Sequence, residues 1–284
     1  MGQSPVIIVV MRSFLAAALT FAIVPAQAGP VASALDAGYR QMYNLDFGGA
    51  HRTFASWKQA HPDDPLGPVS DAAAYLFAEL DRLSVLQGEF FADDSTFLKP
   101  KRLSPDPMAK AAFLLEIEGA ERSAKAVLAR SPRDANARFA AILALGLRSD
   151  YLGLIEKSYV TSLSSMKASR LAAETLLSID GSYYDAYLAI GVENYMLSLK
   201  PAPIRWLLRL GGAATDRDEG VKQLRITAEK GYYLKPFARL LMAVAALRDK
   251  DIATARGILQ SLSKEYPGNR LYSEELAKLK VKLK

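Results

Sequence analysis

From Val31 onward, hydrophobic residues recur at intervals of three and four positions. This is the spacing of α-helices that bury one face, and the two-residue alternation typical of β-strands is scarce before the last few residues. Helices are expected at roughly 31–46, 48–61, 69–90, 106–130, 134–150, 160–179, 183–197, 216–230, 234–248, 251–265 and 270–282. The pattern therefore predicts an all-α fold.

Residues that interrupt or cap helices support these boundaries. Prolines fall between the predicted helices, at Pro62, Pro65, Pro105, Pro107, Pro132, Pro201, Pro203 and Pro267. Asp216, followed three residues later by Glu219, is typical of a capping box that starts a helix, and Gly231 ends the same helix. A loop near 91–105 and an insertion at 198–215 break the regular succession of helices.

An internal repeat is the strongest pattern in the chain. An alanine is followed, after eleven intervening residues, by a proline at Ala50 to Pro62, Ala120 to Pro132 and Ala255 to Pro267. In the first and last copies a small residue lies twelve positions before the alanine and a bulky one four positions after it: Gly38 with Phe54, and Ala243 with Leu259. Small side chains allow two helices to approach closely, and the proline ends the second helix.

This pattern resembles the tetratricopeptide repeat, a helix-turn-helix unit that stacks into a superhelix. The resemblance implies an α-solenoid of about five helix pairs with a C-terminal capping helix, in a divergent exported bacterial member of that superfamily. It also implies a non-catalytic scaffold or adaptor that binds a protein or peptide partner along its concave face. The first and last units fit the motif best.

The resemblance places a concave face on particular residues. If Gly38 and Gly191 each occupy the eighth position of a repeat, that face passes through Leu35, Tyr39, Met42, Asp185, Leu188, Val192 and Tyr195. Tyr39, Met42, Asp185 and Tyr195 are accordingly expected to contact the partner. The alternative is that packing against other helices closes this face.

The first 28 residues have the features of a secretory signal peptide. Arg12 is their single charge, Phe14 to Val24 is an apolar run, and Ala26-Gln27-Ala28 is a site that signal peptidase accepts. We expect cleavage after Ala28, a helical domain over 29–284, and export to the periplasm. The alternative is an uncleaved membrane anchor.

Chemical motifs favour binding over catalysis. The chain has no cysteine, no Gly-x-Ser-x-Gly turn, no Gly-rich phosphate loop and no His-Glu-x-x-His. His51 and His61 lie ten residues apart on one predicted helix, about 15 Å along its axis, so they are too distant to share a metal ion and are expected at the surface. We expect no cofactor and no enzymatic activity; a carboxylate-dependent hydrolase of the cell envelope is the alternative.

Positive charge is concentrated in one stretch. The whole chain carries a formal charge of +6, a modest excess that does not call for a nucleic-acid partner. Nine basic and four acidic residues lie between Lys200 and Arg239, a net charge of +5. Within this stretch Arg205, Trp206 and Arg209 suit an anionic membrane surface or an acidic protein. Alternatively, Trp206 and the adjacent leucines fold back into the core.

Overall fold

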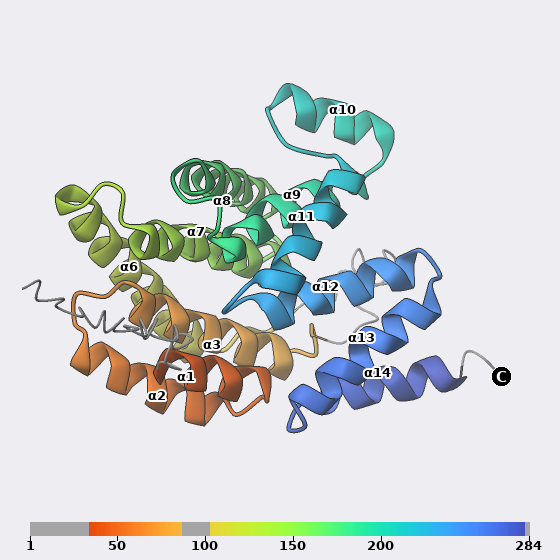
Figure 1. The fold of residues 1–284 in the computed structure, drawn as a ribbon, viewed down its shortest axis with the longest axis horizontal. Helices are drawn as coiled ribbons and strands as arrows, with labels where there is room; N and C mark the ends of the chain where they lie inside the picture. Colours follow the sequence, from red (N-terminus) through yellow and green to blue (C-terminus); the bar gives the residue numbers. More distant parts are fainter. Residues whose placement is uncertain (1–33, 87–102, 282–284) are drawn as a thin grey trace, which may run out of the picture. The chain divides into compact units, whose positions relative to one another are not determined.

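Helices make up most of residues 34–86 and 103–281, the part of the chain that the structure, a computed structural model, describes (Figure 1). They are α1 (Ala34–Tyr43), α2 (Phe47–Ala60), α3 (Leu66–Arg82), α6 (Pro107–Arg130), α7 (Ala135–Asp150), α8 (Tyr159–Ile179), α9 (Tyr187–Ser198), α10 (Ala202–Leu210), α11 (Arg217–Lys230), α12 (Lys235–Arg248), α13 (Ile252–Glu265) and α14 (Arg270–Val281). Within these two ranges there is no strand, so the all-α prediction is confirmed.

The observed helices follow the predicted ones, with four differences. The helix predicted over 69–90 begins at Leu66 and ends at Arg82. The insertion at 198–215 contains a helix of its own, α10. A π-helical turn, η1 (Tyr151–Ile155), extends α7, and a short 3₁₀ turn, η2 (Tyr184–Ala186), precedes α9. The predicted signal peptide and most of the loop predicted near 91–105 lie outside the described residues.

Aspartates start many of the helices. Asp46, Asp106, Asp134, Asp216 and Asp251 each accept a hydrogen bond from a backbone N–H in the first turn of the helix that follows. The predicted helix start at Asp216 is therefore confirmed. The other half of the expected capping box is absent, because the Asp216 N–H donates to the side chain of Asn194 and not to that of Glu219.

Helices that follow one another in sequence pack side by side, from α1 against α2 through to α13 against α14. The exception is α10, which stands outside this series while α9 packs directly against α11 (Figure 1). Glycines allow that close approach, since a Cβ atom at Gly220 would lie 2.6 Å from the backbone nitrogen of Tyr195. No helix in the described ranges has both the length and the hydrophobicity needed to cross a bilayer.

The first helices also meet the last ones. The Tyr43 hydroxyl donates to the carbonyl oxygen of Tyr233 at 3.0 Å, and the Asn269 side-chain amide donates to the Tyr43 carbonyl at 2.9 Å. The rings of Tyr39 and Tyr233 lie 4.7 Å apart. These contacts join residues roughly two hundred positions apart in sequence, so the first helix is fixed to the last part of the chain.

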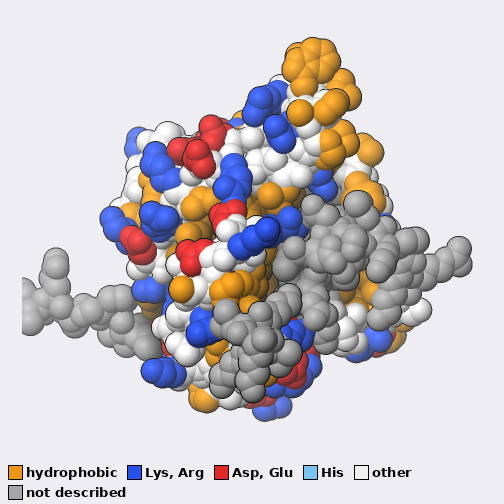
Figure 2. Space-filling model, turned by 90° about the vertical axis from the view of Figure 1, so that its right-hand side faces the viewer, with side chains coloured by type: hydrophobic (Ala, Val, Ile, Leu, Met, Phe, Trp, Pro, Cys, Tyr) orange, Lys and Arg blue, Asp and Glu red, His pale blue; other side chains and the backbone are white. Residues whose placement is uncertain are grey.

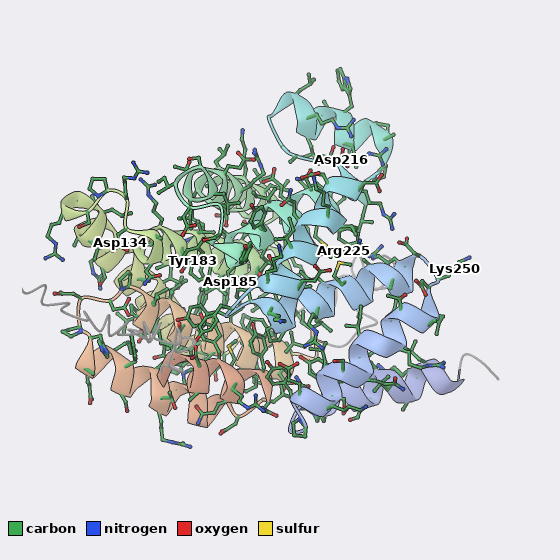
Figure 3. The ribbon with its side chains drawn as sticks, in the orientation of Figure 1. Asp134, Tyr183, Asp185, Asp216, Arg225 and Lys250 are labelled. Carbon is green, nitrogen blue, oxygen red and sulfur yellow. The ribbon has the colours of Figure 1, made fainter. Side chains whose placement is uncertain are left out.

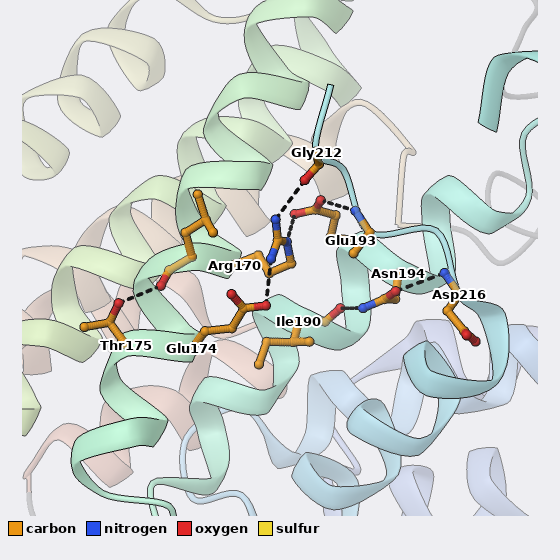
Figure 4. A network of polar contacts seen from close by, with 10 residues as sticks. Arg170, Glu174, Thr175, Ile190, Glu193, Asn194, Gly212 and Asp216 are labelled. Atoms are coloured by element: carbon orange, nitrogen blue, oxygen red, sulfur yellow. Dashed lines mark hydrogen bonds and ion pairs between the residues drawn. The ribbon is translucent and has the colours of Figure 1, made fainter. Parts of the chain in front are cut away.

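A buried polar network fixes the segment that follows α10 (Figure 4). Arg170 of α8 pairs with Glu193 of α9 at 3.0 Å and donates to the Gly212 carbonyl at 3.0 Å. The other carboxylate oxygen of Glu193 accepts the Ala214 N–H at 2.8 Å. The network thus ties the end of the insertion to two helices of the main series.

Candidate binding cavity

An apolar cavity of about 280 Å³ lies among α1, α3, α7, α8, α9 and α12. Its wall consists mainly of Leu, Met, Phe and Tyr side chains, including Phe77, Leu163, Met166, Met196 and Phe237. On α8 the lining residues recur at helical spacing: Leu163 and Met166 supply apolar side chains to the wall, while the Ser162 and Ser169 hydroxyls donate to backbone carbonyls of α7. A ligand with apolar groups would bury these side chains on binding.

Two carboxylates lie in the cavity wall, and one of them, that of Asp185, stabilises the fold. Asp185 is 4 % exposed and accepts the backbone N–H groups of Tyr232, Tyr233 and Leu234 at 2.9–3.1 Å. It thereby holds the turn that leads into α12 (Figure 3). Burial raises the pKa of Asp185, and the three N–H groups act in the opposite direction.

The other carboxylate, Asp150, lies at the C-terminal end of α7 and has no hydrogen-bond or ion-pair partner among the described residues. Desolvation raises the pKa of Asp150 from 3.8 to about 7. Near neutral pH a substantial fraction of this carboxyl is protonated. It can then donate a hydrogen bond to a bound molecule as well as accept one.

Replacing Asp150 with asparagine should remove a pH dependence of stability. The folded pKa of about 7 exceeds the ordinary value of 3.8, so the stabilising contribution of the protonated acid is complete below pH 3.8 and is lost as the pH rises through 7. Relative to wild type, the Asp150→Asn variant should gain roughly 2–3 kcal/mol in unfolding free energy between pH 5 and pH 8. Urea unfolding at the two pH values measures this difference, and parallel curves for both proteins would contradict it.

The cavity gathers some of the residues predicted to bind a partner. Tyr39, Met42 and Asp185 all line it, although they come from segments far apart in sequence. Tyr195 does not: it is 1 % exposed and packs against Gly220 of α11.

The predicted residues of the insertion lie elsewhere, because Arg205, Trp206 and Arg209 all belong to α10. The alternative that Trp206 folds back into the core is wrong, since its side chain is 61 % exposed. The two arginines face backbone carbonyls and the Thr215 hydroxyl, so they hold the helix in place.

Sequence reasoning missed most of the cavity wall. The stripe on α8 that contains Leu163 and Met166 has the same spacing as any helix face buried in a core, so nothing in the pattern distinguishes a wall from a core. The sequence pattern did not indicate Asp150 as a wall residue for a different reason. It directly precedes an apolar π-helical turn, and only the fold brings apolar side chains from other helices around it.

No protein-family model matches the chain, and no curated protein matches it.

A cluster of ionisable side chains lies outside the cavity, where α2, α3 and α6 meet. His51 Nδ1 is 2.5 Å from one oxygen of Asp71, and Lys58 Nζ is 2.6 Å from both the other oxygen and Glu116. These side chains satisfy one another's polar groups and link three helices. His51 is partly exposed and its partner lies twenty residues away in sequence, whereas His61 is exposed, as predicted.

Proposed function

We propose that this protein is an exported, non-catalytic helical-repeat protein of tetratricopeptide type that binds an apolar segment of a protein partner in its inner cavity. The observation that carries the proposal is the cavity itself, whose wall is formed by one face of several successive helices. Features of residues 1–28 support export. The partner would insert side chains, not a folded surface, because the volume lies near the lower end of the range for small-ligand pockets, roughly 300–1,000 Å³.

The contacts of small residues support the repeat assignment. In the first unit, Gly38 is so close to Phe54 that a Cβ atom would lie 2.2 Å from its ring. Gly191 makes the equivalent contact with Leu224, at 2.9 Å. The first pair is 16 positions apart and the second is 33 positions apart. The additional 17 positions are accounted for by the insertion that carries α10, so α9 and α11 correspond to one interrupted unit.

The state of the two carboxylates favours binding over hydrolysis. Hydrolysis by paired carboxylates needs one group to donate a proton while the other acts as base or nucleophile. Asp185 is occupied by three backbone N–H groups, which leaves Asp150 alone among the described carboxylates of the wall. Met166 and Met196 suit a binding role, since flexible thioether side chains adapt to different apolar partners.

Photo-crosslinking from within the cavity tests this function. The photoreactive residue p-benzoylphenylalanine would replace Met166 in the wall, and as a matched control Leu171, which is 46 % exposed on the same helix. Irradiation of intact cells should give a protein adduct from position 166 and none from position 171. A second substitution in the wall, Ala189→Phe, should remove the adduct by occupying the cavity. Equal adducts from both positions, or adducts with lipid alone, would contradict the proposal.

A further inference from the structure

Helix α10 carries an apolar surface that nothing in the described chain covers. None of its nine residues is buried. Ile204, Trp206, Leu207 and Leu210 are 46–68 % exposed. Figure 2 shows hydrophobic side chains gathered at the top of the view, the height at which α10 stands in Figure 1, with basic side chains next to them.

The basic and the apolar side chains of α10 lie on opposite faces of the helix. At 100° per residue, Arg205 and Arg209 share one side, and Leu207 lies on the opposite side. Arg205 donates to the Lys200 carbonyl at 2.8 Å, and Arg209 Nε donates to the Thr215 hydroxyl at 2.5 Å. The arginines therefore fasten α10 to its own connecting segments and direct its apolar side outward.

The protein body holds α10 in this orientation. After the helix, the Gly211 and Gly212 carbonyls accept bonds from Lys167 and Arg170, and the Ala214 N–H donates to Glu193. These contacts tie the end of the insertion to α8 and α9. The exposed apolar side is thus presented from a fixed support.

The segment that carries α10 has a net positive charge. From Lys200 to Thr215 the sequence has three basic residues and no acidic one. Arg205 and Arg209 bond to neutral oxygens, so no carboxylate of the described chain cancels their charge. Lys167 adds a further cation beside Gly211. Such a surface is complementary to an anionic one.

The size of α10 favours a lipid surface over a protein. A helix of nine residues is about 13 Å long, whereas each side of a stable protein interface buries roughly 800 Å². A bilayer surface requires no complementary shape, and tryptophan together with leucine suits the boundary between headgroups and acyl chains. We propose that α10 docks the protein on an anionic phospholipid bilayer, with Trp206, Leu207 and Leu210 entering the interface. This inference is independent of the occupant of the cavity.

Tryptophan fluorescence can follow this docking directly. The chain has two tryptophans, so the Trp57→Phe variant emits from Trp206 alone. Vesicles containing phosphatidylglycerol should shift this emission to shorter wavelength, and brominated acyl chains should quench it. Vesicles of phosphatidylcholine alone, or high salt, should give a much weaker response. An unchanged spectrum with anionic vesicles at low salt would overturn the proposal, as would equal responses to the two lipids.

Paired substitutions test whether vesicle binding depends on α10 or on exposed leucines in general. Leu207→Ser combined with Leu210→Ser should weaken binding to phosphatidylglycerol vesicles roughly ten- to hundredfold. The matched control, Leu115→Ser combined with Leu171→Ser, removes exposed leucines elsewhere and should bind as wild type does. Equal losses in the two variants would overturn the proposal. So would a finding that the α10 variant loses only self-association, because the face would then be a contact between copies of the chain.

Discussion

Replacing Glu193 with alanine is expected to lower the free energy of unfolding by roughly 3–5 kcal/mol. Glu193 is fully buried and pairs with Arg170, which is only 8 % exposed. The substitution leaves a buried guanidinium without its buried counter-ion and also leaves the Ala214 N–H without its acceptor. Urea unfolding followed by circular dichroism measures the loss.

Glu174 provides a matched control for this effect. It pairs with the same guanidinium at 2.7 Å, but its side chain is 45 % exposed. Glu174→Ala should therefore cost no more than about 1 kcal/mol. Similar losses for the two variants would show that the buried pair is not the element that fixes the insertion.

Replacing Asp185 with alanine should cost about 3 kcal/mol or more, because it leaves the backbone N–H groups of Tyr232, Tyr233 and Leu234 without their buried acceptor. Asp185→Asn, which retains one carbonyl oxygen, should recover part of the loss. Asp180, which is partly exposed and accepts a hydrogen bond from Ser182 N–H, supplies the control, and its replacement should have a much smaller effect. Thermal unfolding of the three variants tests this order, and a loss at Asp180 equal to that at Asp185 would contradict it.

The helices could be predicted from the sequence because they depend on the local spacing of hydrophobic residues. Prolines between helices and aspartates at helix starts mark their boundaries. The sequence could not predict contacts between distant segments. The bond from Tyr43 to Tyr233 and the pair of His51 with Asp71 have no local signature. The spacing of hydrophobic residues also did not show that the stripe containing Met166 lines a cavity. Helix residues that line a cavity and helix residues buried in a core have the same spacing.

The insertion shows a different limit. Its composition indicated an amphipathic segment, but hydrophobicity alone favoured burial of Trp206. The two helices that flank the insertion, α9 and α11, leave no space between them for such a side chain. Gly191 and Gly220 bring those two helices too close for that, since any added side chain would meet backbone atoms. Helix α10 is consequently left at the surface.

The contacts between the first and last helices have a consequence for folding. In an open array of repeats, each unit contacts only its neighbours and can melt separately. Here Tyr43 bonds to both Tyr233 and Asn269, which leave the ribosome long after it does. We expect the two ends to unfold in one cooperative transition, and their closure to be a slow, late step of folding. The partner proposed for the cavity would enter before that closure and be enclosed as the final helices pack.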